Sequence, residues 1–208
     1  MSGEPVRRWK EDALALALLA AAVVFVVHPA LGGHLPAVRD MPGFTVPSRW
    51  FWRSSVLHGE LPVWNPLVAF GVPVFAAPVH GALYPGHLLL LAGPFATAFG
   101  LTWAAHAFWG GAGGYALARR MGCRPQAALV SGLVWGIGGY AIAMWWNGEK
   151  TLSDAWVPWV AWGVGRLAHG PRLRASRLAV AAGAGALLCA AGDPFLLFDA
   201  VLLAVPVA

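Results

Sequence analysis

The chain is poor in charged residues, which make up only 11% of its 208 positions, against about 25% in soluble domains. Apolar residues account for 59% of the sequence, and the mean hydropathy is +0.64. So little charge excludes an ordinary soluble domain. Instead, apolar runs close to the roughly 20 residues that cross a hydrocarbon core predict an all-α polytopic membrane protein. The runs lie near residues 13–31, 101–118, 127–146, 155–168 and 178–192.

Cysteine is also scarce, with two residues in the chain. Cys123 falls in a predicted cytoplasmic loop and Cys189 in a predicted span, so no disulfide framework is expected. The sequence has neither close-spaced cysteines nor a metal-binding helix motif, which argues against a zinc site. No stripe of basic and aromatic residues is present either, and the pattern therefore gives no indication of nucleic-acid binding.

The basic residues that are present report on topology. Ten of the 14 lie in three short clusters beside predicted spans, which the positive-inside rule assigns to the cytoplasm. A cytoplasmic N-terminus follows. The first span is interpreted as an uncleaved signal anchor rather than a signal peptide, because "HPALGGH" offers no convincing cleavage site. The clusters are Arg7, Arg8 and Lys10; Arg119, Arg120 and Arg124; and Arg166, Arg172, Arg174 and Arg177.

This topology places residues 32–100 outside as a large first extracytoplasmic loop. Within it, "HLLLLAGPFATAFG" (87–100) is short and contains Gly93 and Pro94, so it predicts an interfacial or re-entrant helix. The stretch "SRWFWRSSVLHG" predicts a second juxtamembrane helix, capped by Ser48. Later in the chain, "NGEKTLSDA" is predicted to be a short outer loop. A sixth span begins at Phe195 and stops at Ala208, so residues 1–208 are expected to form one transmembrane domain of a longer protein.

Polar residues in this loop are candidates for chemistry. Arg49 and Arg53 are four positions apart on the predicted helix and share a face, where they could hold a lipid phosphate or simply anchor to anionic headgroups. Asp40 follows the first span. It could accept a proton from an acceptor hydroxyl or bind a divalent cation, and the alternative is an ordinary solvated carboxylate.

The segment "GELPVWNPLVAFGVPVFAAPVHGALYP" (59–85) interrupts the apolar pattern with five prolines. Proline fixes φ and prevents a continuous helix, so this stretch predicts a rigid, irregular lid over the helix bundle. His80, Tyr84 and, just beyond it, His87 are its polar groups. In the later outer turns, Asp193 is predicted to cap a helix break, whereas Glu149 and Lys150 are interpreted as solvated turn residues.

Asp40, the proline-rich segment, "LLLL" and "GGYALARRMG" together resemble the start of YfhO-type bacterial membrane proteins, within the GT-C glycosyltransferase superfamily. The likeness covers about residues 13–169, and its most specific part is Gly-x-Leu-Pro-x-Trp-Asn-Pro. Family members are several times longer. Two positions depart from the pattern and leave specificity open: His80 stands where Gln is expected, and Asp193 stands where the family has Gly-His-Pro at 192–194.

The resemblance implies a GT-C helix bundle in the bacterial cytoplasmic membrane. It implies an enzyme that takes sugar from a polyprenyl-phosphate donor and passes it to an envelope glycan or another acceptor at the outer face. Asp40 maps to the catalytic acidic residue, and a divalent metal could assist it. A lipid or glycolipid transporter is the main alternative, and a non-catalytic scaffold is a third. The residues expected to contact substrate are Arg49, Arg53, Trp64, Asn65, His80, Tyr84, His87 and Asp193.

Overall fold

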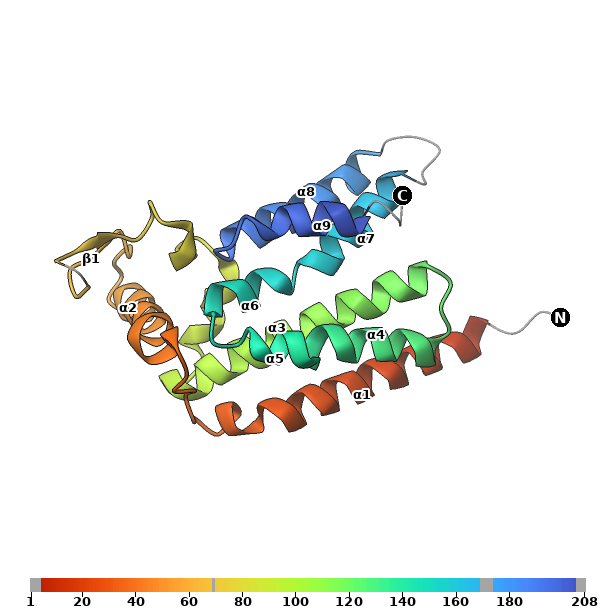
Figure 1. Ribbon diagram of the computed structural model, residues 1–208, viewed down its shortest axis with the longest axis horizontal. Helices are drawn as coiled ribbons and strands as arrows, with labels where there is room; N and C mark the ends of the chain where they lie inside the picture. The colour runs from red at the N-terminus through yellow and green to blue at the C-terminus, as the bar shows by residue number, and fades with distance from the viewer. Residues whose placement is uncertain (1–4, 69, 169–173, 205–208) are drawn as a thin grey trace.

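A computed structural model describes residues 5–68, 70–168 and 174–204 of the chain (Figure 1). It is mostly helical, and every predicted span has a helix at its place. The expectation of an α-helical protein is therefore confirmed. The long helices are α1 (Pro5–Leu31), α3 (Phe95–Arg120), α4 (Pro125–Ile137), α7 (Val157–Ala168), α8 (Ala175–Ala190) and α9 (Leu196–Ala204).

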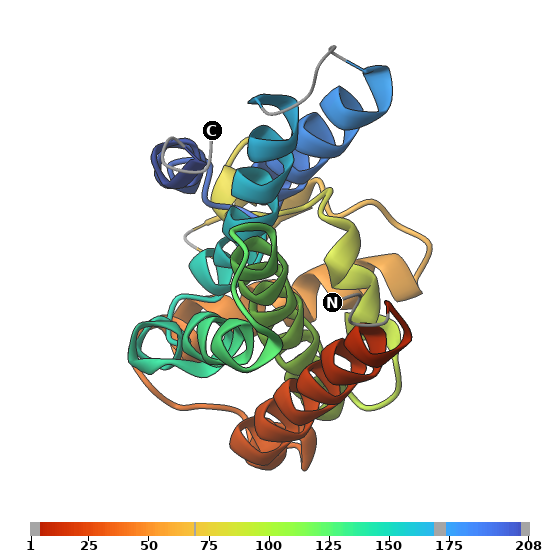
Figure 2. The same cartoon turned by 90° about the vertical axis from the view of Figure 1, so that its right-hand side faces the viewer.

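The central helix is α3, which packs against α1, α4 and α7. Figure 2 shows it in the middle, with α1 and α4 on one side and α7 to α9 on the other. Glycines allow this close approach: a Cβ on Gly111 would lie 2.8 Å from the Gly132 carbonyl oxygen, and one on Gly136 would lie 2.6 Å from that of Ala107. Small residues at these positions let the helices approach closely.

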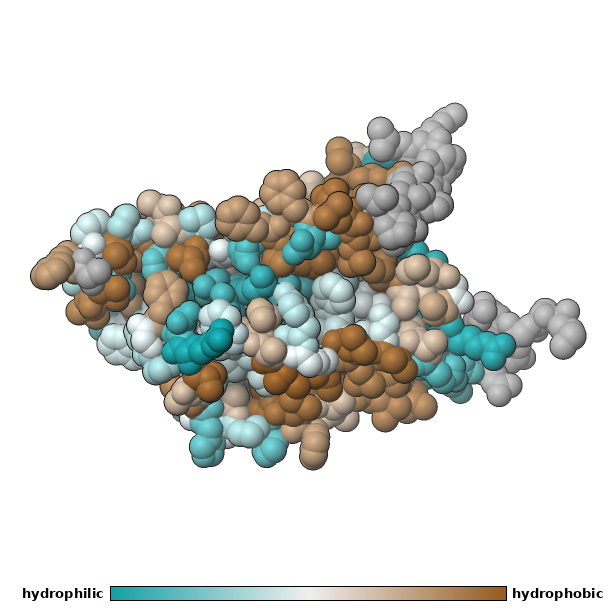
Figure 3. Space-filling view, viewed as in Figure 1, coloured by the Kyte–Doolittle hydropathy of each residue, from teal (hydrophilic) through white to brown (hydrophobic). Residues whose placement is uncertain are grey.

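Among the described residues, two segments are long and apolar enough to cross a membrane, Trp9–Leu31 and Pro125–Ala143. The central α3 has 26 residues, or about 39 Å at 1.5 Å per residue, yet it carries glycines, tryptophans and His106. Its neighbours enclose it, so it does not need a uniformly apolar surface. Figure 3 shows apolar side chains on the outer surface over α4 and over α8 and α9. Exposed large apolar residues there include Val130, Val134, Leu178 and Leu202.

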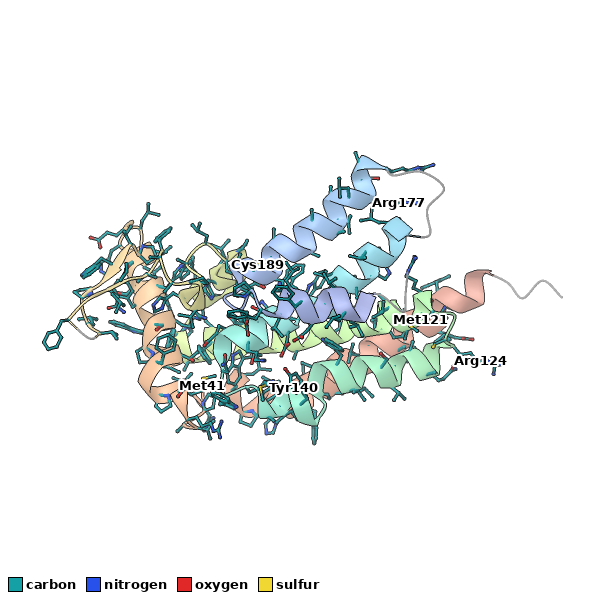
Figure 4. The ribbon with its side chains drawn as sticks, turned by 45° about the horizontal axis from the view of Figure 1, so that its top comes forward. Met41, Met121, Arg124, Tyr140, Arg177 and Cys189 are labelled. Carbon is teal, nitrogen blue, oxygen red and sulfur yellow. The ribbon has the colours of Figure 1, made fainter. Side chains whose placement is uncertain are left out.

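The predicted cytoplasmic clusters meet at one end of the bundle. Arg119 forms an ion pair with Asp12 of α1, with Nε 2.8 Å from Oδ1, and Tyr115 donates a hydrogen bond to the same carboxylate. Arg120 donates to the carbonyl of Gly165 in α7. Figure 4 shows Arg124 and Arg177 at this same end. We call it the basic end, defined by Arg119, Arg120, Arg124 and Arg177; Arg172 lies outside the described residues.

The opposite end, which we call the loop end, contains residues 32–94 and 138–156 and the turn at 191–195. Its short elements fold over the ends of the long helices (Figure 1). The two strands pair antiparallel, with Trp64 opposite Pro73 and Asn65 opposite Val72. The elements are η1 (Met41–Thr45), α2 (Val46–Leu57), β1 (Trp64–Asn65), β2 (Val72–Pro73), η2 (Pro78–His80), η3 (Pro85–Leu91), α5 (Gly139–Ala143) and α6 (Gly148–Asp154).

The structure corrects two predicted helices of the outer loop. The juxtamembrane helix begins at Val46, with Thr45 at the N-cap position and no side-chain cap, so the predicted cap at Ser48 is wrong. The predicted single helix over residues 87–100 is wrong too. It divides at Gly93, whose φ of +79° suits glycine, and Pro94 then precedes the first turns of α3.

Two later predictions also need correction. The supposed outer loop "NGEKTLSDA" contains the helix α6, because the Asn147 side chain accepts a hydrogen bond from the backbone N–H of Lys150, at 3.0 Å. The predicted span 127–146 is not continuous. It breaks into α4 and α5 at Gly138, which has the extended backbone angles φ −67° and ψ 170°.

Candidate functional site

Arg49 lies at the centre of the loop end. It belongs to α2, its side chain is only 4% exposed, and Nη1 donates to the His80 carbonyl oxygen at 2.5 Å. Burial lowers the pKa of Arg49 to about 10, against the opposing attraction of Glu149. Arg53, one turn later, donates from Nη2 to the Gly93 carbonyl at 2.7 Å. Both guanidinium groups thus hold the chain's own backbone, and phosphate binding by them stays a prediction.

Glu149 was predicted to be a solvated turn residue, and the structure shows a different environment. It lies in the first turn of α6, and its Oε2 atom is buried without a hydrogen-bond partner among the described residues. Burial raises the pKa of Glu149; Arg49 opposes this shift, and the carboxylates of Asp193 and Asp40 add to it. Glu149 is therefore not a solvated turn residue, and it links Asp40 and Asp193 electrostatically to Arg49.

Asp40 is exposed at the start of η1. The chain beside it is fixed to the start of α6 at two points. The guanidinium of Arg39 lies 4.7 Å from the ring centroid of Trp146. Thr45 packs so closely on Gly148 that a Cβ there would lie 2.3 Å from the threonine Cγ2. Asp40 is thus an exposed carboxylate on an anchored segment.

Asp193 lies in the turn between α8 and α9. Its Oδ1 accepts a hydrogen bond from the backbone N–H of Phe195 at 3.1 Å, so Asp193 closes a turn within the helix break, and α9 begins only at Leu196. Its own N–H donates to Ser153 Oγ of α6, at 3.0 Å. The preceding Gly192, with φ +125°, packs against Glu149 and the backbone of Pro78. This turn is therefore held against both α6 and η2.

His80 and His87 lie on either side of Tyr84 in the folded lid. His80 is 7% exposed, with its ring centroid 5.5 Å from that of Phe44. Burial and the Arg49 cation lower the pKa of His80. His87 is fully buried, and burial, Arg49 and His106 hold its pKa well below the usual value, with the Gly81 backbone opposing part of the shift. Both imidazoles are thus neutral near pH 7.

Tyr84 belongs to a buried hydrogen-bond chain that enters α3. The His106 Nδ1 lies 2.6 Å from the Thr102 carbonyl, so Nδ1 carries the proton and Nε2 accepts. The Tyr84 hydroxyl donates to Nε2 at 2.6 Å and accepts from Trp156 Nε1 at 2.8 Å. Burial raises the pKa of Tyr84 to about 12, and the Trp156 hydrogen bond opposes the shift. Sequence reasoning missed His106, although a histidine inside an apolar helix is a recognised signal.

An apolar pocket of about 420 Å³ lies beside this chain. The polar atoms of Tyr84 and His106 are already bonded to each other and to their neighbours. The pocket therefore offers hydrocarbon and aromatic surface, which suits an alkyl or isoprenoid chain. Its walls include Tyr84, Pro85, His106, Trp109, Trp156 and Leu187.

The remaining predicted site residues lie in the hairpin, away from Arg49. Asn65 is 2% exposed, and its Oδ1 accepts from the Leu67 N–H at 3.0 Å, which holds the turn. Trp64 is 54% exposed and covers Gly71, where a Cβ would lie 2.4 Å from the indole ring. Both residues shape the loop, as the resemblance implied. Substrate contact by Trp64 and Asn65 stays a prediction.

The described residues contain no group of three or more His, Cys, Asp or Glu side chains that could hold a metal ion. The carboxylates of Asp40 and Asp193 each add to the rise in the pKa of Glu149 that burial causes. Comparison with family models, curated proteins and solved structures finds no match. The likeness to YfhO-type proteins therefore rests on the sequence motifs alone.

Proposed function

We propose that the chain is the N-terminal part of a polytopic membrane glycosyltransferase of the GT-C, YfhO-like type. It moves a sugar from a polyprenyl-phosphate donor to an envelope glycan or another acceptor. One observation carries the proposal: the exposed Asp40 lies on a segment at the loop end that Arg39 and Thr45 hold against the start of α6. The sequence motifs that resemble the family lie in the same region.

The orientation of the bundle follows from its two ends. The described arginines that the positive-inside rule assigns to the cytoplasm share the basic end (Figure 4). The loop end, with Asp40, then faces the outer side of the bacterial cytoplasmic membrane, and the N-terminus lies inside. In this orientation α1, α3, α4 with α5, α7, α8 and α9 cross the membrane or line the crossing segments.

The proposed chemistry needs a base and a place for lipid. Asp40 accepts the proton of the acceptor hydroxyl as that oxygen attacks the anomeric carbon, and the donor phosphate leaves. The hydrocarbon chain of the donor occupies the apolar pocket beside Tyr84 and Trp156. This pairing of an open carboxylate and a lipid-sized apolar pocket at one end supports a lipid-linked substrate.

The test is transfer of labelled sugar from polyprenyl-phosphate donors by membranes that contain the full-length protein. Asp40→Asn should lower the rate by about 10²-fold or more at matched expression, since a positioned base contributes on this scale. Glu60→Gln changes another exposed carboxylate of the outer loop and should keep full activity. Equal rates for wild type and Asp40→Asn would remove Asp40 from the mechanism.

A lipid or glycolipid transporter is the second candidate, and two observations favour it. The α4–α5 helix is broken at Gly138, as the helices of many transporters are. Burial, reinforced by Asp193 and Asp199 and opposed by Lys150, raises the pKa of Asp154 to about 7. A transporter would move labelled lipid across proteoliposomes without sugar transfer, and Asp154→Asn would abolish the movement. Sugar transfer that survives Asp154→Asn would favour the enzyme.

A further inference from the structure

A second, much smaller cavity lies where η1, α2, η3, α3 and α6 meet. Its volume is about 10 Å³, close to the space that one water molecule occupies. Leu90, Phe99 and Leu152 form much of its apolar wall. Thr45, Arg49 and His87 also line it, so three buried polar side chains share this small cavity.

Two of these three side chains have polar atoms without protein partners. His87 is 0% exposed, and neither ring nitrogen has a hydrogen-bond partner of normal geometry within the described residues, although the Gly81 backbone lies close enough to the ring to raise its pKa. Thr45 is 2% exposed, and its Oγ1 is likewise unpartnered there. Buried polar atoms in folded proteins nearly always have a partner, either another protein group or an ordered water. Their convergence on one cavity therefore points to a ligand.

The chemistry of the lining selects that ligand. Arg49 can only donate hydrogen bonds and carries positive charge, so it excludes a cation. His87 is neutral because its pKa is held low, and its unprotonated nitrogen needs a donor. A monatomic anion supplies none and would face that lone pair. A small neutral molecule that both donates and accepts matches Arg49, the Thr45 hydroxyl and the unprotonated nitrogen of His87, and the ring N–H is left to the Gly81 backbone.

We propose that this cavity binds one ordered water molecule, which accepts a hydrogen bond from Arg49 and donates to His87 and Thr45. The water ties α2, η3 and η1 together beneath the loop end. It also completes the surroundings of Arg49, whose Nη1 holds the His80 carbonyl. This hydration site is independent of the proposed sugar transfer and would exist equally in a transporter.

The sign of a stability change tests the proposal. Thr45→Val replaces the hydroxyl with a methyl group of the same shape. If a water bonds to the hydroxyl, the variant loses that bond, and the Tm of the purified full-length protein in lipid nanodiscs falls by about 2–4 °C. If the cavity is dry, the variant removes an unpartnered polar atom, and the Tm rises or stays the same, which would overturn the proposal.

A double variant sharpens the result. His87→Leu should also lower the Tm, and it gives the same sign test if Thr45→Val does not fold. Because one water serves both side chains, the double variant should lose less than the sum of the two single losses. Strictly additive losses would overturn the bridge. Thr151→Val, whose hydroxyl bonds to the carbonyls of Met144 and Asn147, calibrates the loss of a hydroxyl with known partners.

Discussion

The two ends of the molecule are held together in different ways. Along the bundle, long helices pack through glycine contacts, and at its basic end the Asp12–Arg119 ion pair joins α1 to α3. At the loop end, side chains of α2 donate to backbone carbonyls 30 to 40 positions later in the chain. The contacts are Arg49 to His80, Trp52 to Ala82 at 2.9 Å, and Arg53 to Gly93.

The spacing of these donors explains the difference. Residues 49, 52 and 53 are three and four positions apart, so they share one face of α2. The proline-rich segment has few ladder hydrogen bonds of its own, and its carbonyls therefore need side-chain donors when they are buried. Regular helices satisfy their own backbone, whereas an irregular lid depends on a helix that satisfies it from outside.

The largest effect is expected at Arg49. Arg49→Met removes a buried charged donor and leaves the His80 carbonyl without its partner, which should cost about 3 kcal/mol. Thermal unfolding and limited proteolysis in nanodiscs would measure it, with cleavage appearing first between residues 58 and 94. Arg53→Met, at the less buried donor, should cost only about 1 kcal/mol. Equal losses for both variants would contradict the central position of Arg49.

A glycine substitution tests the packing between the long helices instead. Gly136→Ala places a methyl group 2.6 Å from the Ala107 carbonyl oxygen, so α3 and α4 must separate. The expected loss is about 1–3 kcal/mol. Gly183→Ala, in α8, has no atom within 4 Å of the added Cβ and should keep or slightly raise the Tm. A harmless Gly136→Ala would show that α3 and α4 do not pack as described.

The Tyr84 chain connects the two halves, and its hydroxyl can be removed without changing the ring. Tyr84→Phe leaves His106 Nε2 and Trp156 Nε1 without their partner, at a cost of about 1–3 kcal/mol. Trp156 fluorescence during thermal unfolding would follow the change. An unchanged Tm would mean that the hydroxyl contributes little to joining the lid to α3.

The smallest effect is expected from Glu149 and depends on pH. Its pKa is raised in the folded protein, so the unfolded chain loses the proton first as pH rises. The wild type should therefore lose stability from about pH 4.5 upward until the folded carboxyl has ionised. Glu149→Gln should match the wild type at low pH and exceed it at pH 7. A less stable Gln variant at pH 7 would mean that attraction to Arg49 outweighs burial.

The sequence was sufficient to predict a helix at the place of each span, because apolar runs are local patterns, but it did not predict the breaks within them. It also placed Asp193 at a helix break. It failed for Glu149 and His106, whose surroundings come from segments far away in the chain. Glu149 is buried because η1, α2 and the Gly192 turn lie together beside α6. The periodicity of one segment cannot predict which distant segments will surround it. The break at Gly138 was missed because glycine is frequent in transmembrane helices, so the Gly138–Gly139 pair was not taken as a helix end.

A role for Asp40 at the outer face requires the basic end and the loop end to face opposite sides of the membrane. In a Cys189→Ala background, native Cys123 reports on the basic end, and Leu61→Cys, at a site 76% exposed, reports on the loop end. A membrane-impermeant thiol reagent should label Leu61→Cys in intact cells, and Cys123 only after permeabilisation. Labelling of Cys123 in intact cells with protection of Leu61→Cys would contradict the orientation and, with it, an outer-face Asp40.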